Sequence, residues 1–265
     1  MAKRKTRVLA VANEKGGVGK TVTVINLGAA LQQQGRQVLI VDMDPQFNAT
    51  RGLGVEPDAD AGTIYDLVAG DGSKTVNDVL VSTRWEGLDL IPSHVDLAGA
   101  EVELVEVAGR EDRLKNALTD LEGRYDFIIC DTPPSLSLLT INVFSYAREV
   151  LVPCQTHPYA YAALGELFDT IDAVGQEIND GLSVTGILAT LYDQRTRVGH
   201  RILEKLKADE RYGPLLLDTV IRANTTIADS ADTGKPVVFY RRGSYGAEDY
   251  TALAREILSR PARMR

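Results

Sequence analysis

Two lysines lie five residues apart in a glycine-rich stretch near the N-terminus. Glycines let backbone N–H groups turn inward around phosphate oxygens, and Gly-Lys-Thr between a strand and a helix closes a phosphate-binding loop. In such a loop Lys20 reaches the β- and γ-phosphates, and the Thr21 hydroxyl ligates Mg²⁺. The ordinary pattern begins with glycine at the position of Glu14, so this loop is a variant. Its other members are Lys15, Gly16, Gly17, Val18 and Gly19.

Carboxylates end two apolar runs farther along the chain. VDMDPQ places Asp42 and Asp44 before a proline turn, and FIICD ends in Asp131. A carboxylate at the end of a buried strand holds Mg²⁺ through water, and a second one orients or deprotonates an attacking water. We therefore expect Asp131 at a metal and a carboxylate of the pair Asp42 and Asp44 to act on water. The plainer alternatives are strand-terminating acids at 42 and 44 and a helix cap at 131.

Positioning these residues requires an alternation of strands and helices. Five apolar runs predict buried strands at 7–13, 37–42, 127–131, 149–154 and 184–192, with weaker candidates at 88–92 and 215–221. Helical patterns cover 21–34, 160–178, 200–208 and 247–259. The alternation predicts an α/β fold with a doubly wound, mostly parallel sheet flanked by helices, which binds ligands beyond the carboxyl ends of its strands.

Length and composition favour a single domain over residues 1–265, because 44% of the residues are hydrophobic. Residues 52–87 are rich in Gly, Asp and Thr, and we interpret them as a loop-rich insertion with one short helix near 64–68. Residues 260–265, RPARMR, are expected to form a flexible tail.

The net charge of −8 excludes a wholly basic nucleic-acid coat protein, but it is unevenly distributed. From Thr190 onward 14 Lys and Arg oppose 10 Asp and Glu, so residues 1–189 carry −12. A basic last third indicates a local anionic partner. Cys130 and Cys154 lack metal-ligand spacing and are expected to be reduced, buried thiols. The N-terminal apolar run is too short for a signal peptide and no segment reaches membrane-spanning length, so we expect a cytoplasmic protein without a membrane partner.

The motifs KGGVGKT, VDMDPQFNAT and DTPPSLSLLTIN, in this order, resemble those of the ParA/Soj-type partition ATPases. These are P-loop NTPases of the deviant Walker A type, the group that includes MinD, and the resemblance covers nearly the whole chain. It implies Mg²⁺-dependent hydrolysis of ATP to ADP and phosphate by a sandwich dimer, in which Lys15 reaches the phosphates of the facing subunit. The implied catalytic residues are Lys15, Lys20 and Asp44, and the implied nucleotide contacts include residues 14–22. The resemblance assigns the action on water, with a contact to metal-bound water, to Asp44.

Several positions depart from the family pattern. Val22 replaces a second threonine after the phosphate lysine, and Phe47 replaces a small residue after DPQ. In the family a Pro-Arg-Asn motif follows a strand late in the chain, and of these three residues only the asparagine is matched here, by Asn224. We therefore expect Asn224 to contact the adenine base.

A predicted helix near residue 200 has basic residues at every fourth position on one face, namely Arg197, Arg201 and Lys205. Apolar residues recur at the same spacing on a different face, namely Val198, Ile202 and Leu206. Such a basic stripe is most often a solvated face. The resemblance, however, implies non-specific binding of double-stranded DNA around the turn DQRT, which contains Arg195. At a later position Thr226 replaces the usual arginine, and Arg222 is a substitute. The expected DNA contacts are Arg195, Arg197, Arg201, Lys205 and Arg222.

The leading hypothesis is a nucleoid-associated switch whose ATP-bound dimer binds DNA, with hydrolysis stimulated by a ParB-type centromere-binding partner during chromosome or plasmid segregation. The alternative is a MinD-like or cargo-positioning ATPase at a membrane or protein assembly, although the last predicted helix offers little bulky apolar surface. An iron–sulfur reductase would need suitably placed cluster cysteines, whereas Cys130 lies inside a predicted strand and Cys154 is far along the chain. A metabolic P-loop enzyme would leave Lys15 unexplained.

Overall fold

A computed structural model describes residues 5–56 and 61–261. Within them an eight-stranded sheet has the order β3-β4-β2-β5-β1-β6-β7-β8. Neighbouring strands are parallel except for β3 against β4, which confirms the predicted doubly wound, mostly parallel α/β fold. The strands are β1 Arg7–Val11, β2 Val38–Asp42, β3 Val81–Ser82, β4 Leu88–Ile91, β5 Phe127–Asp131, β6 Glu149–Gln155, β7 Ser183–Tyr192 and β8 Leu216–Arg222.

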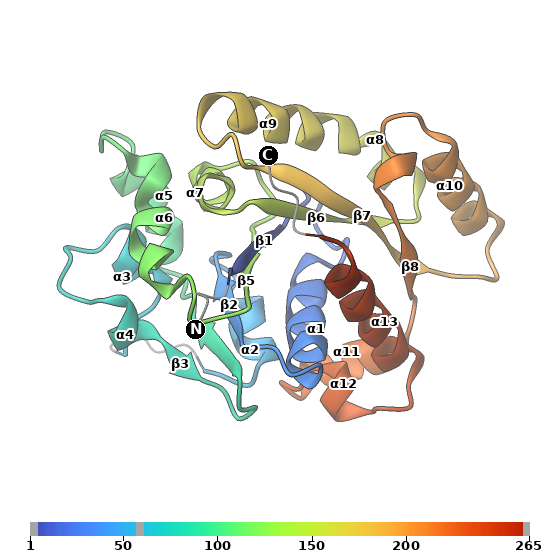
Figure 1. The fold of residues 1–265 in the computed structure, drawn as a ribbon, viewed down its shortest axis with the longest axis horizontal. Coiled ribbons are helices and arrows are strands. Elements are labelled where there is room, and N and C mark those ends of the chain that lie inside the picture. The colour runs from blue at the N-terminus through green and yellow to red at the C-terminus, as the bar shows by residue number, and fades with distance from the viewer. Residues whose placement is uncertain (1–4, 57–60, 262–265) are drawn as a thin grey trace.

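Helices cover both faces of the sheet (Figure 1). Helices α1 and α13 lie on one face, and α7 and α9 lie on the other. The helices are α1 Lys20–Gln33, α2 Asn48–Gly52, α3 Ile64–Val68, α4 Val76–Val79, α5 Leu97–Glu103, α6 Arg113–Leu118, α7 Leu138–Tyr146, α8 Pro158–Ala162, α9 Leu164–Glu177, α10 Arg197–Ala208, α11 Thr225–Asp232, α12 Val237–Tyr240 and α13 Tyr245–Ser259.

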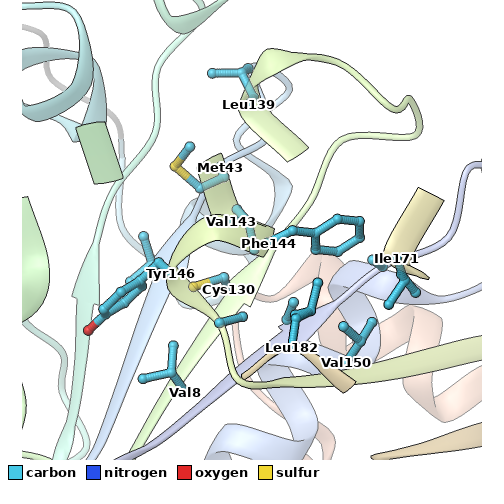
Figure 2. Packing of buried hydrophobic residues seen from close by; sticks show 14 of the residues in the cluster. Val8, Met43, Cys130, Leu139, Val143, Phe144, Tyr146, Val150, Ile171 and Leu182 are labelled. Carbon is cyan, nitrogen blue, oxygen red and sulfur yellow. The ribbon is translucent and has the colours of Figure 1, made fainter. Parts of the chain in front are cut away.

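The near-continuous apolar strands divide their side chains between two cores. In β1, Val8 belongs to the core under α7 and α9, whereas Leu9 belongs to the core under α1 and α13. Figure 2 shows the first of these cores, where Phe144 of α7 lies between Ile171 of α9 and the sheet. Burial on both faces explains why these strands read as apolar runs rather than as alternating ones.

The element boundaries differ in detail from the predicted ones. The first strand ends at Val11, and the helix predicted over 160–178 is two helices that meet at Ala163, beginning with Pro158 at a favourable first position. Helix α10 begins at Arg197 rather than at His200 because Thr196 caps it, its hydroxyl accepting a hydrogen bond from the Gly199 N–H.

The stretch 52–87 contains the expected helix near 64–68, which is α3, together with α4 and the edge strand β3. Residues 57–60 of this stretch, and residues 262–265 of the predicted tail, lie outside the described residues. Arg260, the first residue of that tail, pairs with Glu256 of α13 and donates to the Thr185 carbonyl oxygen.

Cys130 and Cys154 are both buried and unpaired, as expected. Burial raises the pKa of each thiol to about 12, so both are protonated at neutral pH. Among the described helices, none has the length and apolarity needed to cross a lipid bilayer.

One buried ion pair joins the first strand to the middle of the sheet and to the last helix. Arg7 of β1 makes a two-pronged contact with Glu149 of β6, at 2.8 and 2.6 Å, and donates to the Ile257 carbonyl oxygen of α13 at 2.6 Å. Thr185 of β7 donates its hydroxyl to the same carboxylate at 2.6 Å. Because Glu149 is only 1% exposed, its charge depends on Arg7 for compensation.

Replacing Arg7 should therefore destabilise the protein strongly. We expect Arg7→Leu to lower the free energy of unfolding by about 3 kcal/mol, because it leaves the buried carboxylate of Glu149 without a compensating charge. Urea unfolding followed by circular dichroism measures this. Arg195→Leu is the matched control, since Arg195 makes a two-pronged pair with Asp193 on the surface, and it should leave the midpoint unchanged. Equal midpoints for the wild type and Arg7→Leu would contradict the assignment.

Candidate functional site

The loop between β1 and α1 has the backbone shape of a phosphate cradle. Gly17 and Gly19 have φ angles of 74° and 90°, in the left-handed region that residues with a Cβ rarely adopt. A Cβ at either position would meet no atom within 4 Å, so conformation rather than space requires glycine here. Helix α1 starts directly afterwards at Lys20, and its free N–H groups therefore face the concave side of the loop.

Lys20 lies within this cradle and is 7% exposed. Its ammonium donates to the Lys15 carbonyl oxygen at 3.3 Å. Burial lowers the Lys20 pKa, while the carboxylates of Asp131 and Asp44 oppose that effect. Two nearby carboxylates thus stabilise the positive charge of Lys20 inside the loop.

Asp42 and Asp131 lie side by side because β2 and β5 are neighbours and pair these two residues in register. Both are fully buried. Asp42 accepts hydrogen bonds from the Thr50 N–H and hydroxyl at 2.8 and 2.7 Å and from the Asp44 N–H at 3.2 Å. Burial raises its pKa to about 6 despite these bonds. Asp42 therefore organises the segment 44–50 and does not face a ligand.

Asp131 differs from Asp42 because neither of its carboxylate oxygens has a hydrogen-bond partner among the described residues. Burial, and then the charge of Asp42, raise its pKa well above the ordinary value, and the nearby Thr21 hydroxyl opposes them. Two buried acceptors without donors are costly unless a cation or a proton satisfies them.

Asp44 lies two residues beyond the end of β2 and lines the pocket beside the cradle. Its side chain accepts the Gln46 N–H at 2.9 Å, and its carbonyl oxygen accepts the Ser93 hydroxyl at 2.8 Å. Burial raises its pKa, while the Gln46 N–H and the charge of Lys20 lower it. One of its carboxylate oxygens is left to act on a ligand or water.

A pocket of about 450 Å³ opens beyond the cradle. Eight of the predicted site residues line it, namely Gly16, Gly17, Gly19, Lys20, Thr21, Val22, Asp44 and Asn224. Its far wall was not predicted and comes from the last third of the chain: Thr190, Leu191, Ile221, Ile227, Ala228 and Tyr250. No local motif marks these apolar residues, because β7, β8, α11 and α13 converge only in the fold.

Backbone strain also marks the pocket. Among the described residues, Phe47 and Leu191 alone combine a side chain with a positive φ, at 46° and 51°. Leu191 lines the pocket, and Phe47 lies between the lining residues Gln46 and Asn48. Strained non-glycine residues persist only where the surrounding structure holds them, and they concentrate at functional sites.

Comparisons with known proteins agree with this geometry. A family model described as an AAA domain matches residues 6–184. The chain is 42% identical over 251 residues to the sporulation initiation inhibitor protein Soj of Bacillus subtilis, covering 95% of this chain and 98% of that protein. It is 41% identical to the chromosome partitioning protein ParA of Myxococcus xanthus, covering 96% and 88%.

A solved structure of cobyrinic acid a,c-diamide synthase from Mycobacterium smegmatis with bound ADP and magnesium is 41% identical and superimposes with a TM-score of 0.82, covering 96% of this chain and 94% of that one. The chain belongs to the ParA/Soj-type family of partition ATPases. This confirms the resemblance of the motifs.

In this ParA/Soj-type chain the signature Lys15 does not line its own pocket. Its N–H donates to the Asn13 side chain at 2.9 Å, and its ammonium lies 5.8 Å from the centre of the Tyr159 ring. The neighbouring Glu14 also faces away, toward Glu166 of α9, and burial followed by the charge of Glu166 raises its pKa. Glu14 was expected to contact nucleotide, and its position outside the pocket does not support that expectation.

Val18 is buried beneath the loop, and its carbonyl oxygen accepts the Thr190 hydroxyl at 2.8 Å. This bond ties the loop to β7, so Val18 supports the cradle without lining the pocket. Asn224 caps α11, where its side chain accepts the Thr226 N–H at 2.8 Å, and it also faces the pocket.

The number of acidic side chains at the site suits a magnesium ion better than a metal that takes most of its ligands from the protein. Across residues 5–56 and 61–261 there is no cluster of three or more His, Cys, Asp or Glu arranged to hold a metal. Mg²⁺ keeps several waters and binds one or two carboxylates together with substrate phosphates. The unpartnered oxygens of Asp131 and the nearby Thr21 hydroxyl provide such an oxygen-only donor set.

The basic residues expected at DNA fall into two groups. Arg197, Arg201 and Lys205 are exposed along α10, and Lys205 lies 3.9 Å from the centre of the Tyr161 ring. Val198 is 41% exposed, so the apolar face of this helix is narrower than expected.

Arg195 and Arg222 are compensated by neighbouring acids. Arg195 is paired with Asp193, and Arg222 is clamped by Asp249 and Glu248 and stacked on Tyr245 at 4.2 Å. Both arginines stay predicted DNA contacts, and each would have to share its charge between a carboxylate and a DNA phosphate.

The unpartnered carboxylate of Asp131 should cost stability in the protein without ligand. A carboxyl whose pKa is raised by folding binds its proton more tightly in the folded state, so the folded state loses relative stability as pH rises from about 4. We expect Asp131→Asn to raise the thermal midpoint at pH 8 by at least about 3 °C. The gain should shrink toward pH 4, where the wild-type carboxyl is protonated.

Thermal scans by calorimetry between pH 4 and pH 8 measure this. Asp120→Asn, at an exposed acid, is the control and should not change the midpoint. A lower midpoint for Asp131→Asn at pH 8 would show that the carboxylate has partners that compensate its burial.

Proposed function

We propose that this chain is a Mg²⁺-dependent ATPase that acts as a partition switch in the cytoplasm, on nucleoid DNA. Its ATP-bound dimer binds duplex DNA without sequence preference, and a ParB-type partner stimulates hydrolysis to drive chromosome or plasmid segregation. The observation that carries the proposal is the meeting of the glycine cradle and Lys20 with the unpartnered carboxylate of Asp131 at one edge of the sheet.

The residues around the cradle divide the work of phosphoryl transfer. The N–H groups of the loop and the Lys20 ammonium would bind the phosphates and compensate their charge. Thr21 and Asp131 would hold Mg²⁺, which polarises the phosphoryl oxygens when bound. The solved structures of the synthase with ADP and with an ATP analogue, each with magnesium and 41% and 39% identical to this chain, support this use of the site.

Asp44 is the residue placed to act on the attacking water. Its backbone is fixed by Ser93, and one oxygen of its side chain is fixed by the Gln46 N–H, so the other oxygen is oriented toward the pocket. Its raised pKa brings the carboxylate closer to the range in which it accepts a proton from water. Asp44 would thus orient the water and take its proton, and it would contact water bound to the metal.

Lys15 supports the dimer part of the proposal. The same loop carries two lysines, and only Lys20 faces the pocket of its own chain. Lys15 is half-buried at the lip of the loop, with its ammonium near the exposed Tyr159 ring rather than near Lys20. A cation in that position is available to the phosphates of a facing subunit, where it would stabilise the charge that develops during transfer.

Exposed basic residues on α10 support DNA binding. Arg197 and Arg201 make no ion pair within the described part of the chain, so their charges are available to phosphates. Two copies of this stripe in an ATP-bound dimer would strengthen the contact by avidity, which links nucleotide state to DNA affinity.

The competing functions are less well supported. Leu253 and Ile257 of α13 are fully buried in the core, so this helix offers no apolar face to a membrane of the kind that a MinD-like ATPase would need. An amide-forming reaction is suggested by the name of the 40% identical synthase. ATP turnover that proceeds without any carboxylic acid or amine substrate separates a switch from such a synthase.

Lys15 should be needed for the dimer but not for nucleotide binding. We expect Lys15→Ala to bind ATP with an affinity within about threefold of the wild type, yet to turn over at least 100-fold more slowly, because the facing cation is lost. Light scattering with ATP should show a monomer.

Asp44→Ala is the contrasting variant, since it keeps Lys15 and should dimerise with ATP while turning over equally slowly. Dimers of Lys15→Ala with normal turnover would refute the role of Lys15, and normal turnover by Asp44→Ala would refute that of Asp44.

The α10 stripe predicts a defined salt dependence. The double variant Arg197→Ala and Arg201→Ala should weaken ATP-dependent binding to random duplex DNA uniformly across sequences. It should also reduce the slope of log affinity against log salt by about 2 per chain. Fluorescence anisotropy with ATP, ADP and no nucleotide at several salt concentrations measures both. An Arg222→Ala control should reduce the slope less, because carboxylates share the charge of Arg222, and an unchanged slope in the double variant would exclude α10.

A further inference from the structure

Helix α5 and the residues next to it expose an unusual number of aliphatic side chains. Val95, Val102, Val105 and Val107 are 54%, 76%, 50% and 37% exposed. The opposite side of the same segment, with Leu97, Ala100 and Leu104, packs into the core. The exposed valines therefore form a second apolar face that nothing in the described chain covers. We call this face, together with the exposed acids Asp96, Glu103 and Glu106, the α5 surface.

The segment that carries this face is acidic. Residues 93–109 contain four Asp and Glu and no Lys or Arg. Helix α3 adds Tyr65, whose hydroxyl donates to Glu103 at 2.8 Å, and His94 lies 2.9 Å from Asp96. An aliphatic stripe with an acidic border complements a segment that has an apolar face and flanking Lys or Arg. Two copies of the α5 surface would instead repel each other, which disfavours a symmetric self-contact.

The segment that leads into α5 is joined directly to the catalytic edge. The Ser93 hydroxyl donates to the Asp44 carbonyl oxygen at 2.8 Å, and the Ser93 N–H donates to the Thr50 hydroxyl at 3.0 Å. Thr50 in turn donates to Asp42. A displacement of the residues before α5 would therefore reach the backbone of Asp44 through one hydrogen bond.

Ring stacking forms a second connection between the same two segments. The Phe47 ring lies 6.2 Å from the His94 ring with an angle of 17° between the planes, and the Arg51 guanidinium covers Phe47 at 4.3 Å. Phe47 has a φ of 46°, so these contacts hold the segment 44–50 in a strained conformation. Loosening the stack would release that strain next to Asp44.

We propose that the α5 surface is the docking site for a basic, amphipathic segment of the stimulating partner, and that docking repositions Asp44 through Ser93 and His94. This inference rests on the proposed partition function and names the surface through which the partner acts. Figure 1 shows α5 and α10 at opposite ends of the longest axis of the molecule, so the partner and DNA can bind at the same time.

The test compares Val102→Lys with Ile178→Lys, an exposed β-branched residue outside the α5 surface as the matched control. ATP turnover is measured at saturating random duplex DNA against the concentration of the purified ParB-type protein of the same organism. We expect Val102→Lys to raise the half-stimulating concentration at least tenfold, the usual scale for an interface hot spot. Basal turnover and DNA affinity should not change, and Ile178→Lys should match the wild type.

A third variant tests the connection to the catalytic edge. Ser93→Ala should bind the partner as the wild type does in co-sedimentation, but its maximal stimulation should fall at least threefold. Glu106→Lys should resemble Val102→Lys, because it reverses a charge at the border of the surface.

The outcomes separate this inference from the proposed function. If the wild type is stimulated and Val102→Lys is stimulated equally at every concentration, the docking surface is wrong and the switch stands. If the ParB-type protein does not stimulate the wild type, both fail. If Val102→Lys instead abolishes ATP-dependent dimerisation without the partner, the α5 surface is an interface between copies of this chain, and the inference is overturned.

Discussion

The structure is organised around negative charge buried at the carboxyl edge of the sheet. Asp42 and Asp131 are adjacent, buried and in register, and within the described part of the chain Lys20 provides compensating positive charge near Asp131. Asp42 uses its oxygens to hold the segment 44–50, whereas those of Asp131 have no partner in the described chain. A fold that keeps such a carboxylate gives up stability in the ligand-free state and recovers it when a cation and phosphates arrive.

Because of this arrangement, a chain of hydrogen bonds joins the end of β2 to the segment 44–50 and to the residues that precede α5. Asp42 fixes Thr50, Thr50 fixes Ser93, and Ser93 fixes Asp44. The chain of hydrogen bonds begins at the buried Asp42 and ends at the backbone of Asp44. The strained Phe47 lies within the same segment, so Asp44 is held by contacts that can be rearranged rather than by a rigid core.

Much of the fold and half of the site could be predicted from the sequence, for identifiable reasons. Strands buried on both faces read as apolar runs, and the residues of the P-loop must be contiguous because one turn makes the cradle. The far wall of the pocket could not be predicted, because Ile227 and Tyr250 reach it only through the packing of α11 and α13. The surroundings of Glu14 could not be predicted, because adjacency in sequence does not determine which way a side chain points, and the acidic partners of Arg222 could not be predicted because they lie 26 and 27 residues away.

The burial of the two native thiols has a practical consequence. Cys130 and Cys154 remain protonated and out of contact with solvent at neutral pH, and the thiolate is the form that reacts with maleimides and disulfides. The natural chain therefore behaves toward such reagents as a cysteine-free background. A single cysteine introduced on an outer helix could carry a fluorophore, and the movements of this ATPase could be followed without first mutating its interior.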